Sequence, residues 1–120
     1  MTQCIKDGTM KRRKVEFYQN DLGHKPVSDW LLELIKDDRR IIGEDIKTLE
    51  FGWPKGMPLC RPLGSGLFEV RSSLNSNKIA RIIFCTTEEN LILLHGFIKK
   101  TQKTPNKELD IALKRKRNMK

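Results

Sequence analysis

The segment KIARIIFCTTEENLILLHGFIKKTQKTP, residues 78–105, decides the fold of this chain. Its first part consists of two apolar runs, IARIIFC and LILLH, which are separated by the acidic turn EEN. Two apolar runs with a short polar turn between them are typical of a β-hairpin. From Gly96 onward the sequence changes, because Lys99, Lys100 and Lys103 follow the last apolar residues. The most hydrophobic strand therefore ends by carrying lysines to the edge of a sheet.

Further strands are predicted outside this hairpin. LFEVRSS (residues 67–73) and LCRPL (residues 59–63) precede it and are set off by the short turns GSG and NSN. The four runs are therefore expected to form an antiparallel meander. KVEFYQ (residues 14–19) is predicted to be a first strand near the N-terminus. Together these runs predict a sheet of four to five strands.

Two consecutive helices are predicted between the first strand and the meander. Pro26 fits the first turn of a helix. An apolar stripe with helical spacing follows it, formed by Val27, Trp30, Leu31, Leu34 and Ile35. Asp38 can cap a second helix that ends at Gly52. Its apolar side is formed by Ile41, Ile42, Ile46 and Leu49. With a tight turn at residues 36–38, the two helices are expected to form an αα-hairpin packed on one face of the sheet.

A third helix is predicted near the C-terminus, with Thr104 as its N-cap and Pro105 in its first turn. Its narrow apolar side is formed by Leu109, Ala112 and Leu113. The order β-α-α-β-β-β-β-α predicts a single α+β domain over residues 11–120, with residues 1–10 as a loose extension. Met10 stands directly before this domain, so Met10 is an alternative to Met1 as the expected native start.

The composition fits a folded protein of the cytoplasm. Hydrophobic residues make up 38% of the chain and charged residues 32%. No apolar run approaches the roughly 18 residues that cross a bilayer, and the N-terminus lacks a signal-peptide pattern, so no membrane association is expected. Cys4, Cys60 and Cys85 are odd in number and widely spaced. We therefore expect neither a disulfide framework nor a metal site, and no cofactor.

The net charge of +9 is concentrated at the C-terminus. Residues 1–98 carry 15 basic and 13 acidic side chains, whereas residues 99–120 carry nine basic and two acidic ones. A basic segment of this kind usually binds a polyanion, most often nucleic acid, although it can also be a solvated tail. The residues expected to contact nucleic acid are Lys55, Arg61, Lys103, Lys107, Lys114, Arg115, Lys116 and Arg117.

Strand alternation predicts where two arginines point. In LFEVRSS, Phe68 and Val70 share the core face, so Glu69 and Arg71 are expected on the opposite, open face. Arg81 is expected beside Arg71 if the two strands pair. Together with the lysines at the end of the hairpin, these arginines would form a basic cleft. The alternative is an exposed strand arginine that only pairs with Glu69.

A basic cleft of this kind could bind RNA or cleave it. Cleavage requires that a 2′-hydroxyl lose its proton and that the charge on the phosphorus centre be stabilised, which lysine and arginine can achieve together. The candidate catalytic residues are Arg71, Arg81, Lys99 and Lys100, with His95 and Lys103 in a second tier. For His95 a structural role in its apolar strand is the alternative. Trp53 and Phe97 could stack on a base or pack internally.

Three motifs occur in an order found in one toxin superfamily. They are LFEVR (residues 67–71), ARIIF (residues 80–84) and HGFIKKTQKTP (residues 95–105), followed by ELDIALKR. Through them the chain resembles, between Val15 and Arg117, the RelE/ParE toxin superfamily and, more closely, its phage-related HigB-type branch. The resemblance implies a RelE-like small domain. The residues that match the family's strand arginines and basic pair are Arg71, Arg81, Lys99 and Lys100.

The resemblance also implies a function, namely the toxin of a type II toxin–antitoxin system. Such toxins are typically endoribonucleases that cut mRNA on the ribosome without a metal. A cognate antitoxin, often a helix-turn-helix protein, neutralises them in a hetero-oligomer. Some members use a C-terminal tyrosine, whereas the one tyrosine here is Tyr18, so the identity of the general base stays open. The alternatives are a ParE-like inhibitor of DNA gyrase that acts by binding, or a non-enzymatic nucleic-acid-binding protein.

Overall fold

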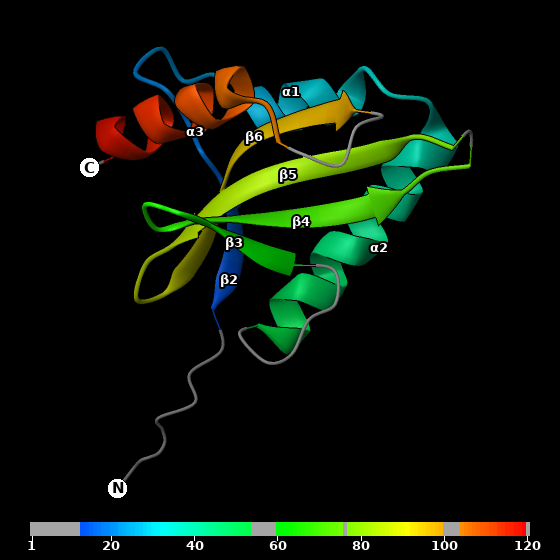
Figure 1. The fold of residues 1–120 in the computed structure, drawn as a ribbon, viewed down its shortest axis with the longest axis horizontal. Helices are drawn as coiled ribbons and strands as arrows, with labels where there is room; N and C mark the ends of the chain where they lie inside the picture. The colour runs from blue at the N-terminus through cyan, green and yellow to red at the C-terminus, as the bar shows by residue number, and fades with distance from the viewer. Residues whose placement is uncertain (1–12, 54–59, 76, 100–103, 120) are drawn as a thin grey trace, which may run out of the picture.

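The computed structural model describes residues 13–53, 60–75, 77–99 and 104–119, and these ranges contain three helices and five strands (Figure 1). In chain order they are β2 (Lys14–Phe17), α1 (Pro26–Leu32), α2 (Lys36–Gly52), β3 (Cys60–Gly64), β4 (Leu67–Ser73), β5 (Ile79–Thr86), β6 (Asn90–Lys99) and α3 (Asn106–Asn118). The predicted α+β class and the order of the elements are confirmed. The predicted loose extension at residues 1–10, including Met10, lies outside the described residues.

The strands form one sheet in the order β2-β6-β5-β4-β3. From β3 to β6 the strands make the expected antiparallel meander, in which Val70 pairs with Ile82 and Ile82 with Gly96. The sequence predicts β2 but not its partner. β2 runs parallel to β6, with Val15 opposite Leu91. The first strand of the described chain therefore lies beside the last one, and all the other strands and the helices α1 and α2 lie between them in the sequence.

The helices α1 and α2 cover one face of the sheet and lie behind it in Figure 1. Their buried side chains Val27, Ile42 and Leu49 pack against the apolar side chains of the sheet, which include Val70 on the face that strand alternation predicts for β4. Trp53 follows α2 and contacts Phe68 and Phe84 edge-on, with ring centroids 4.8 and 5.3 Å apart. Trp53 therefore packs against this core, which favours internal packing of Trp53 over stacking on a base.

The turn between α1 and α2 lies earlier than the sequence predicts. Backbone N–H groups of Glu33 and Leu34 bond the carbonyls three residues before them, which tightens the end of α1. As a result Ile35 leaves the apolar stripe and is 68% exposed. The second helix begins at Lys36, so Asp38 is a buried residue of its first turn and not its N-cap.

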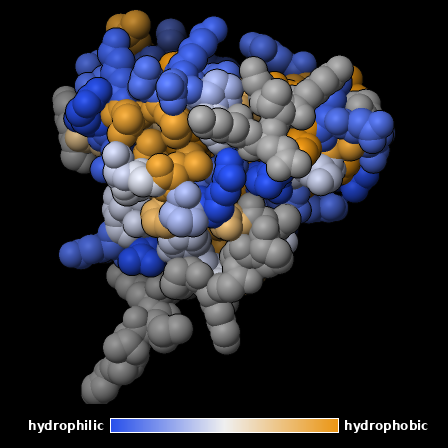
Figure 2. Space-filling view, viewed as in Figure 1, coloured by the Kyte–Doolittle hydropathy of each residue, from blue (hydrophilic) through white to orange (hydrophobic). Residues whose placement is uncertain are grey.

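The opposite face of the sheet is partly covered by α3, which corrects the prediction of an open face. Below α3 lie the buried side chains Leu67, Ile83, Cys85, Leu94 and Phe97. Figure 2 shows an apolar patch next to α3 and hydrophilic side chains beside it over the middle of the sheet. The narrow apolar side of α3 thus closes one part of this face, which includes Leu67 at the start of β4, and the polar part lies beside it.

The described helices and cysteines add two further observations. None of the helices in these ranges is long and apolar enough to span a membrane. Cys60 and Cys85 are free thiols, and Cys4 lies outside the described residues. Burial raises the pKa of Cys60 to about 11, so this thiol is protonated, and hence a weak nucleophile, at neutral pH.

Candidate functional site

The two strand arginines lie next to each other, as strand alternation predicts. Arg71 on β4 pairs directly with Arg81 on β5. Their surroundings differ, because Arg81 is fully buried whereas Arg71 is partly exposed. The Nε atom of Arg71 is buried and has no hydrogen-bond partner among the described residues. Of the two guanidinium groups, that of Arg71 is the one that a ligand can reach.

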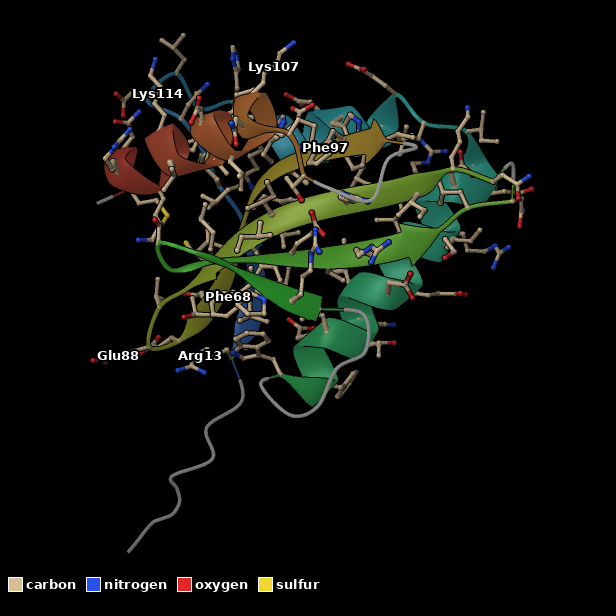
Figure 3. All side chains as sticks on the ribbon, viewed as in Figure 1. Arg13, Phe68, Glu88, Phe97, Lys107 and Lys114 are labelled. Carbon is tan, nitrogen blue, oxygen red and sulfur yellow. The ribbon has the colours of Figure 1, made fainter. Side chains whose placement is uncertain are left out.

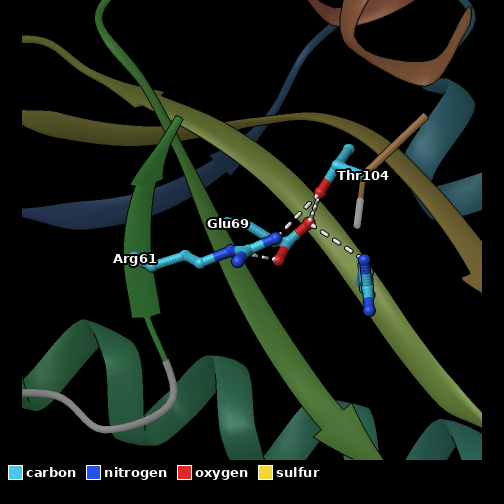
Figure 4. Close-up of polar contacts among 4 residues, drawn as sticks. Arg61, Glu69 and Thr104 are labelled. Carbon is cyan, nitrogen blue, oxygen red and sulfur yellow. Dashed lines mark hydrogen bonds and ion pairs between the residues drawn. The ribbon is translucent and has the colours of Figure 1, made fainter. Parts of the chain in front are cut away.

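A buried carboxylate lies beside these arginines. Glu69 is 0% exposed, so the prediction that it faces solvent is wrong. Its Oε1 accepts a hydrogen bond from Arg61 Nε at 3.2 Å, and its Oε2 accepts one from Thr104 Oγ1 at 2.5 Å (Figure 4). Arg81 Nη1 lies 3.9 Å from the same Oε2. Buried charges need such partners, because loss of hydration is costly.

Thr104 has a different role from the predicted one. The residue before the first turn of α3 is Pro105, and no side chain caps the helix. Thr104 is buried, and its hydroxyl donates to Glu69 and accepts from Arg61 Nη2 at 3.4 Å. The prediction of Thr104 as N-cap is therefore wrong: its side chain points to the sheet, where it joins the polar cluster of Arg61, Glu69, Arg71, Arg81 and Thr104.

The charges of this cluster are not balanced among its described members. Its guanidinium groups outnumber its one carboxylate, which leaves a net charge of +2 if Arg81 keeps its proton. Burial lowers the pKa of Arg81, Glu69 raises it, and the nearby Arg71 and Arg61 lower it further. Arginine nevertheless stays charged at neutral pH. A partly buried excess of positive charge attracts an anion, and guanidinium groups match phosphate oxygens in geometry.

His95 joins α3 to β6. Its Nε2 lies 2.6 Å from Glu108 Oε1, and its Nδ1 lies 3.4 Å from Arg115 Nη1, which also donates to the carbonyl of Leu94 at 2.8 Å. Because arginine can only donate, Nδ1 is assigned as the acceptor and Nε2–H as the donor to Glu108. Both ring nitrogens are occupied in this way, which favours the structural alternative for His95.

Acidic pH is expected to weaken the fold through His95. Burial lowers its pKa from 6.5, the Glu108 contact opposes this shift, and Arg115 adds to it. The folded state thus resists protonation that the unfolded state accepts. The resulting stability is present above pH 6.5 and is lost as the pH falls toward the lower folded pKa. Urea unfolding at pH 7.5 and at lower pH values should show a steeper loss of the free energy of unfolding in the wild type than in His95→Gln. Equal losses would contradict this role.

The other basic residues that were predicted to contact nucleic acid differ in how exposed they are. Lys107, Lys114 and Arg117 are exposed on α3, and Figure 3 shows the labelled Lys107 and Lys114 pointing away from the sheet. Arg115 instead points inward, where burial lowers its pKa. Lys116 is half-buried and reaches toward Gly66. The residues Lys55, Lys100 and Lys103 lie outside the described ranges, as does the side chain of Lys99 at the end of β6.

Sequence reasoning missed how the cluster is connected. Arg61 is predicted only as an RNA contact, and Glu69 only as a possible partner of a strand arginine. The strand pattern could have indicated this connection. Arg61 pairs with Glu69 on the adjacent strand, and Glu69 and Arg71 lie on the same face of β4 because they are two residues apart. Phe97 is 7% exposed and its ring stacks on His95 at 5.6 Å. This arrangement favours internal packing of Phe97 over base stacking.

The fold and the site together define a small α+β domain with an arginine cluster on one sheet face. The sequence profile of the family described as "Phage derived protein Gp49-like (DUF891)" matches residues 29–117. This match spans most of the chain, from α1 to the last turn of α3, and the chain therefore belongs to this family, which is a RelE/ParE-like toxin family. A search of curated proteins found no match. Membership indicates a toxin-like protein and suggests an antitoxin partner.

Proposed function

We propose that this protein is a HigB-type toxin of a type II toxin–antitoxin system and that it cleaves mRNA on the ribosome in the cytoplasm, without a metal or other cofactor. One observation carries the proposal. In a chain of a RelE/ParE-like toxin family, the reachable guanidinium of Arg71 lies directly beside the buried charge of Arg81. The positive charge of such a pair can stabilise an RNA phosphate, because the negative charge of the phosphate increases during cleavage.

Two arginines of the cluster and the basic residues at the end of β6 have defined parts in the proposed reaction. Arg71 donates to the non-bridging phosphate oxygens. Arg81 does not touch the RNA, but its positive charge, buried beside Arg71, attracts the phosphate. The 2′-hydroxyl must lose a proton and the leaving 5′-oxygen must gain one. Lys99 and Lys100 are the candidates for these proton transfers. His95 and Lys103 remain second to them, and His95 would have to give up one of its two contacts.

Binding to the ribosome is assigned to the exposed basic residues. Lys107, Lys114 and Arg117 on the outer side of α3 can contact phosphates without being needed for the fold. Lys55, Lys103 and Lys116 are further proposed contacts to the ribosome. Arg115 is withdrawn from it, because its guanidinium bonds Leu94 in the interior. The antitoxin, which we expect to be a helix-turn-helix protein in a hetero-oligomer with the toxin, would cover this charge with acidic groups.

The proposal is tested by mapping message ends after a short pulse of expression. A reporter message is compared with the same message without its start codon, in cells that express the wild type or the double variant Arg71→Ala, Lys100→Ala. We expect cuts at a fixed place within codons, only in the translated message and only with the wild type. A chelator selective for transition metals, which leaves the Mg²⁺ of the ribosome in place, should not stop cleavage by the isolated toxin on purified, pre-programmed ribosomes.

The other outcomes point to the alternative functions. Growth arrest with intact messages and DNA damage would replace the proposal by inhibition of gyrase. Absence of arrest would leave a nucleic-acid-binding protein. Truncation of residues 114–120 does not separate these cases, because it also removes Arg115 and Met119, which contact Leu94 and Cys85 inside the domain.

A further inference from the structure

The buried carboxylate of Glu69 has no part in the proposed chemistry, yet it contacts the groups that surround the site. We infer that Glu69 and Thr104 are positioning residues, which fix the guanidinium groups beside and below Arg71 so that an RNA phosphate meets a preformed site. This inference rests on the proposed function for its substrate. It goes beyond it in naming residues that touch neither the RNA nor the reacting atoms.

Glu69 connects parts of the chain that are distant in sequence. Through its Oε1 it holds Arg61 of β3, and through its Oε2 it holds Thr104 before α3 and lies near Arg81 of β5. A single carboxylate on β4 therefore connects side chains of its two neighbouring strands and of Thr104, which precedes α3 (Figure 4). These contacts of one buried carboxylate tie the three segments together, and such rigidity is what a preorganised site requires.

The charges of the cluster show that Glu69 organises the site without neutralising it. One carboxylate stands against the guanidinium groups of Arg61, Arg71 and Arg81, so the described cluster keeps its positive charge. Without the carboxylate these like charges would repel one another and move apart. With it they stay close together and still attract a phosphate. Glu69 thus keeps the guanidinium groups close together, and enough positive charge remains for them to bind the phosphate of the substrate.

Thr104 completes the arrangement through its hydroxyl. A hydroxyl has one proton and can accept in addition. Thr104 Oγ1 donates to Glu69 and accepts from Arg61 Nη2, so it connects the second nitrogen of this guanidinium to the same network. The side chain is 4% exposed, and hence it is not itself a contact for RNA. Its loss should loosen Arg61 and the carboxylate together.

The test uses substitutions of similar side-chain volume at each position. Glu69→Gln removes the charge and Thr104→Val removes the hydroxyl. Thr104→Ser keeps the hydroxyl and loses only a methyl group. The matched control is Glu44→Gln, because Glu44 also pairs with an arginine, Arg40, at 3.5 Å, but on the exposed side of α2. For each protein two quantities are measured at equal folded concentration. One is the rate of message cleavage at saturating toxin on programmed ribosomes, and the other is the Kd for a short single-stranded RNA at several salt concentrations.

Glu69→Gln and Thr104→Val are expected to lower the cleavage rate without weakening RNA binding. In Glu69→Gln the cleavage rate should fall by about 100-fold, the effect of misplacing a reacting group by about 1 Å. RNA binding should be equal or tighter, because one negative charge is lost. Thr104→Val should also cleave more slowly, Thr104→Ser should recover most of the rate, and Glu44→Gln should behave like the wild type. A parallel loss of rate and affinity, or wild-type rates in both Glu69→Gln and Thr104→Val, would overturn the inference.

Failure of the proposed function gives a different result. If the wild type binds RNA but cuts no message, the nuclease proposal fails, and the affinity measurements alone decide the role of Glu69. Tighter RNA binding by Glu69→Gln but not by Glu44→Gln would then support a carboxylate that organises an RNA-binding arginine site. Unchanged binding in both variants would reject it.

Discussion

Replacement of Arg71 by alanine is expected to slow message cleavage by about 10²- to 10³-fold, which is the usual cost of removing one donor that stabilises a transition-state charge. The expectation follows from geometry, since Arg71 is the partly exposed member of the cross-strand arginine pair. Its side chain lies on the sheet face opposite α1 and α2, so its loss removes little of the main core. Growth arrest on expression should disappear together with the cleavage.

The measurement is single-turnover cleavage on programmed ribosomes, with ribosome affinity determined separately. Arg40→Ala is the matched control, because Arg40 is an exposed arginine of α2 that pairs with Glu44. Arg71→Lys should retain affinity but recover the rate only in part, since an ammonium keeps the charge and lacks the planar fork of donors. A full cleavage rate in Arg71→Ala would contradict the assignment, whereas a rise in Kd alone would make Arg71 a binding residue.

The strands could be predicted from the sequence because their two faces differ in polarity. In β4, Phe68 and Val70 alternate with Glu69 and Arg71, and this pattern predicts the side that faces the helices. The short turns then determined the meander. Local patterns of this kind depend only on residues within one or two strands, so a single sequence is sufficient to read them.

Features that depend on distant parts of the chain could not be predicted in this way. The parallel pairing of β2 with β6 joins Val15 to Leu91, and nothing near Val15 specifies that partner. Burial by α3 is also a tertiary effect, although the apolar residues that produce it were identified. For the same reason the arginine pair was predicted, but the contact between Glu69 and Thr104, 35 positions apart, was not. In the sequence pattern of a strand, a buried carboxylate cannot be distinguished from an exposed one until the distant segments that bury it are known.

Gly96 is the position in β6 where a small change is expected to have the largest effect on stability. A Cβ atom at Gly96 would lie 2.5 Å from Cε3 and Cζ3 of Trp30. No side chain tolerates such a distance, so the indole ring of α1 must move away from the sheet. Gly96→Ala is therefore expected to lower the free energy of unfolding by about 1–3 kcal/mol, the usual cost of overpacking. Urea unfolding at neutral pH measures this loss.

Two further variants separate the steric cause from a general effect of replacing glycine. Gly43→Ala makes the same change inside α2, where a Cβ would meet nothing within 4 Å, and it should stabilise the protein by about 0.5–1 kcal/mol. Trp30→Leu removes the opposing ring atoms, so Gly96→Ala should cost much less in that background than in the wild type. An equal cost in both backgrounds would mean that the glycine is required by the strand and not by Trp30. The close approach of α1 to β6 would then need another explanation, because no other side chain comes this near to Gly96 among the described residues.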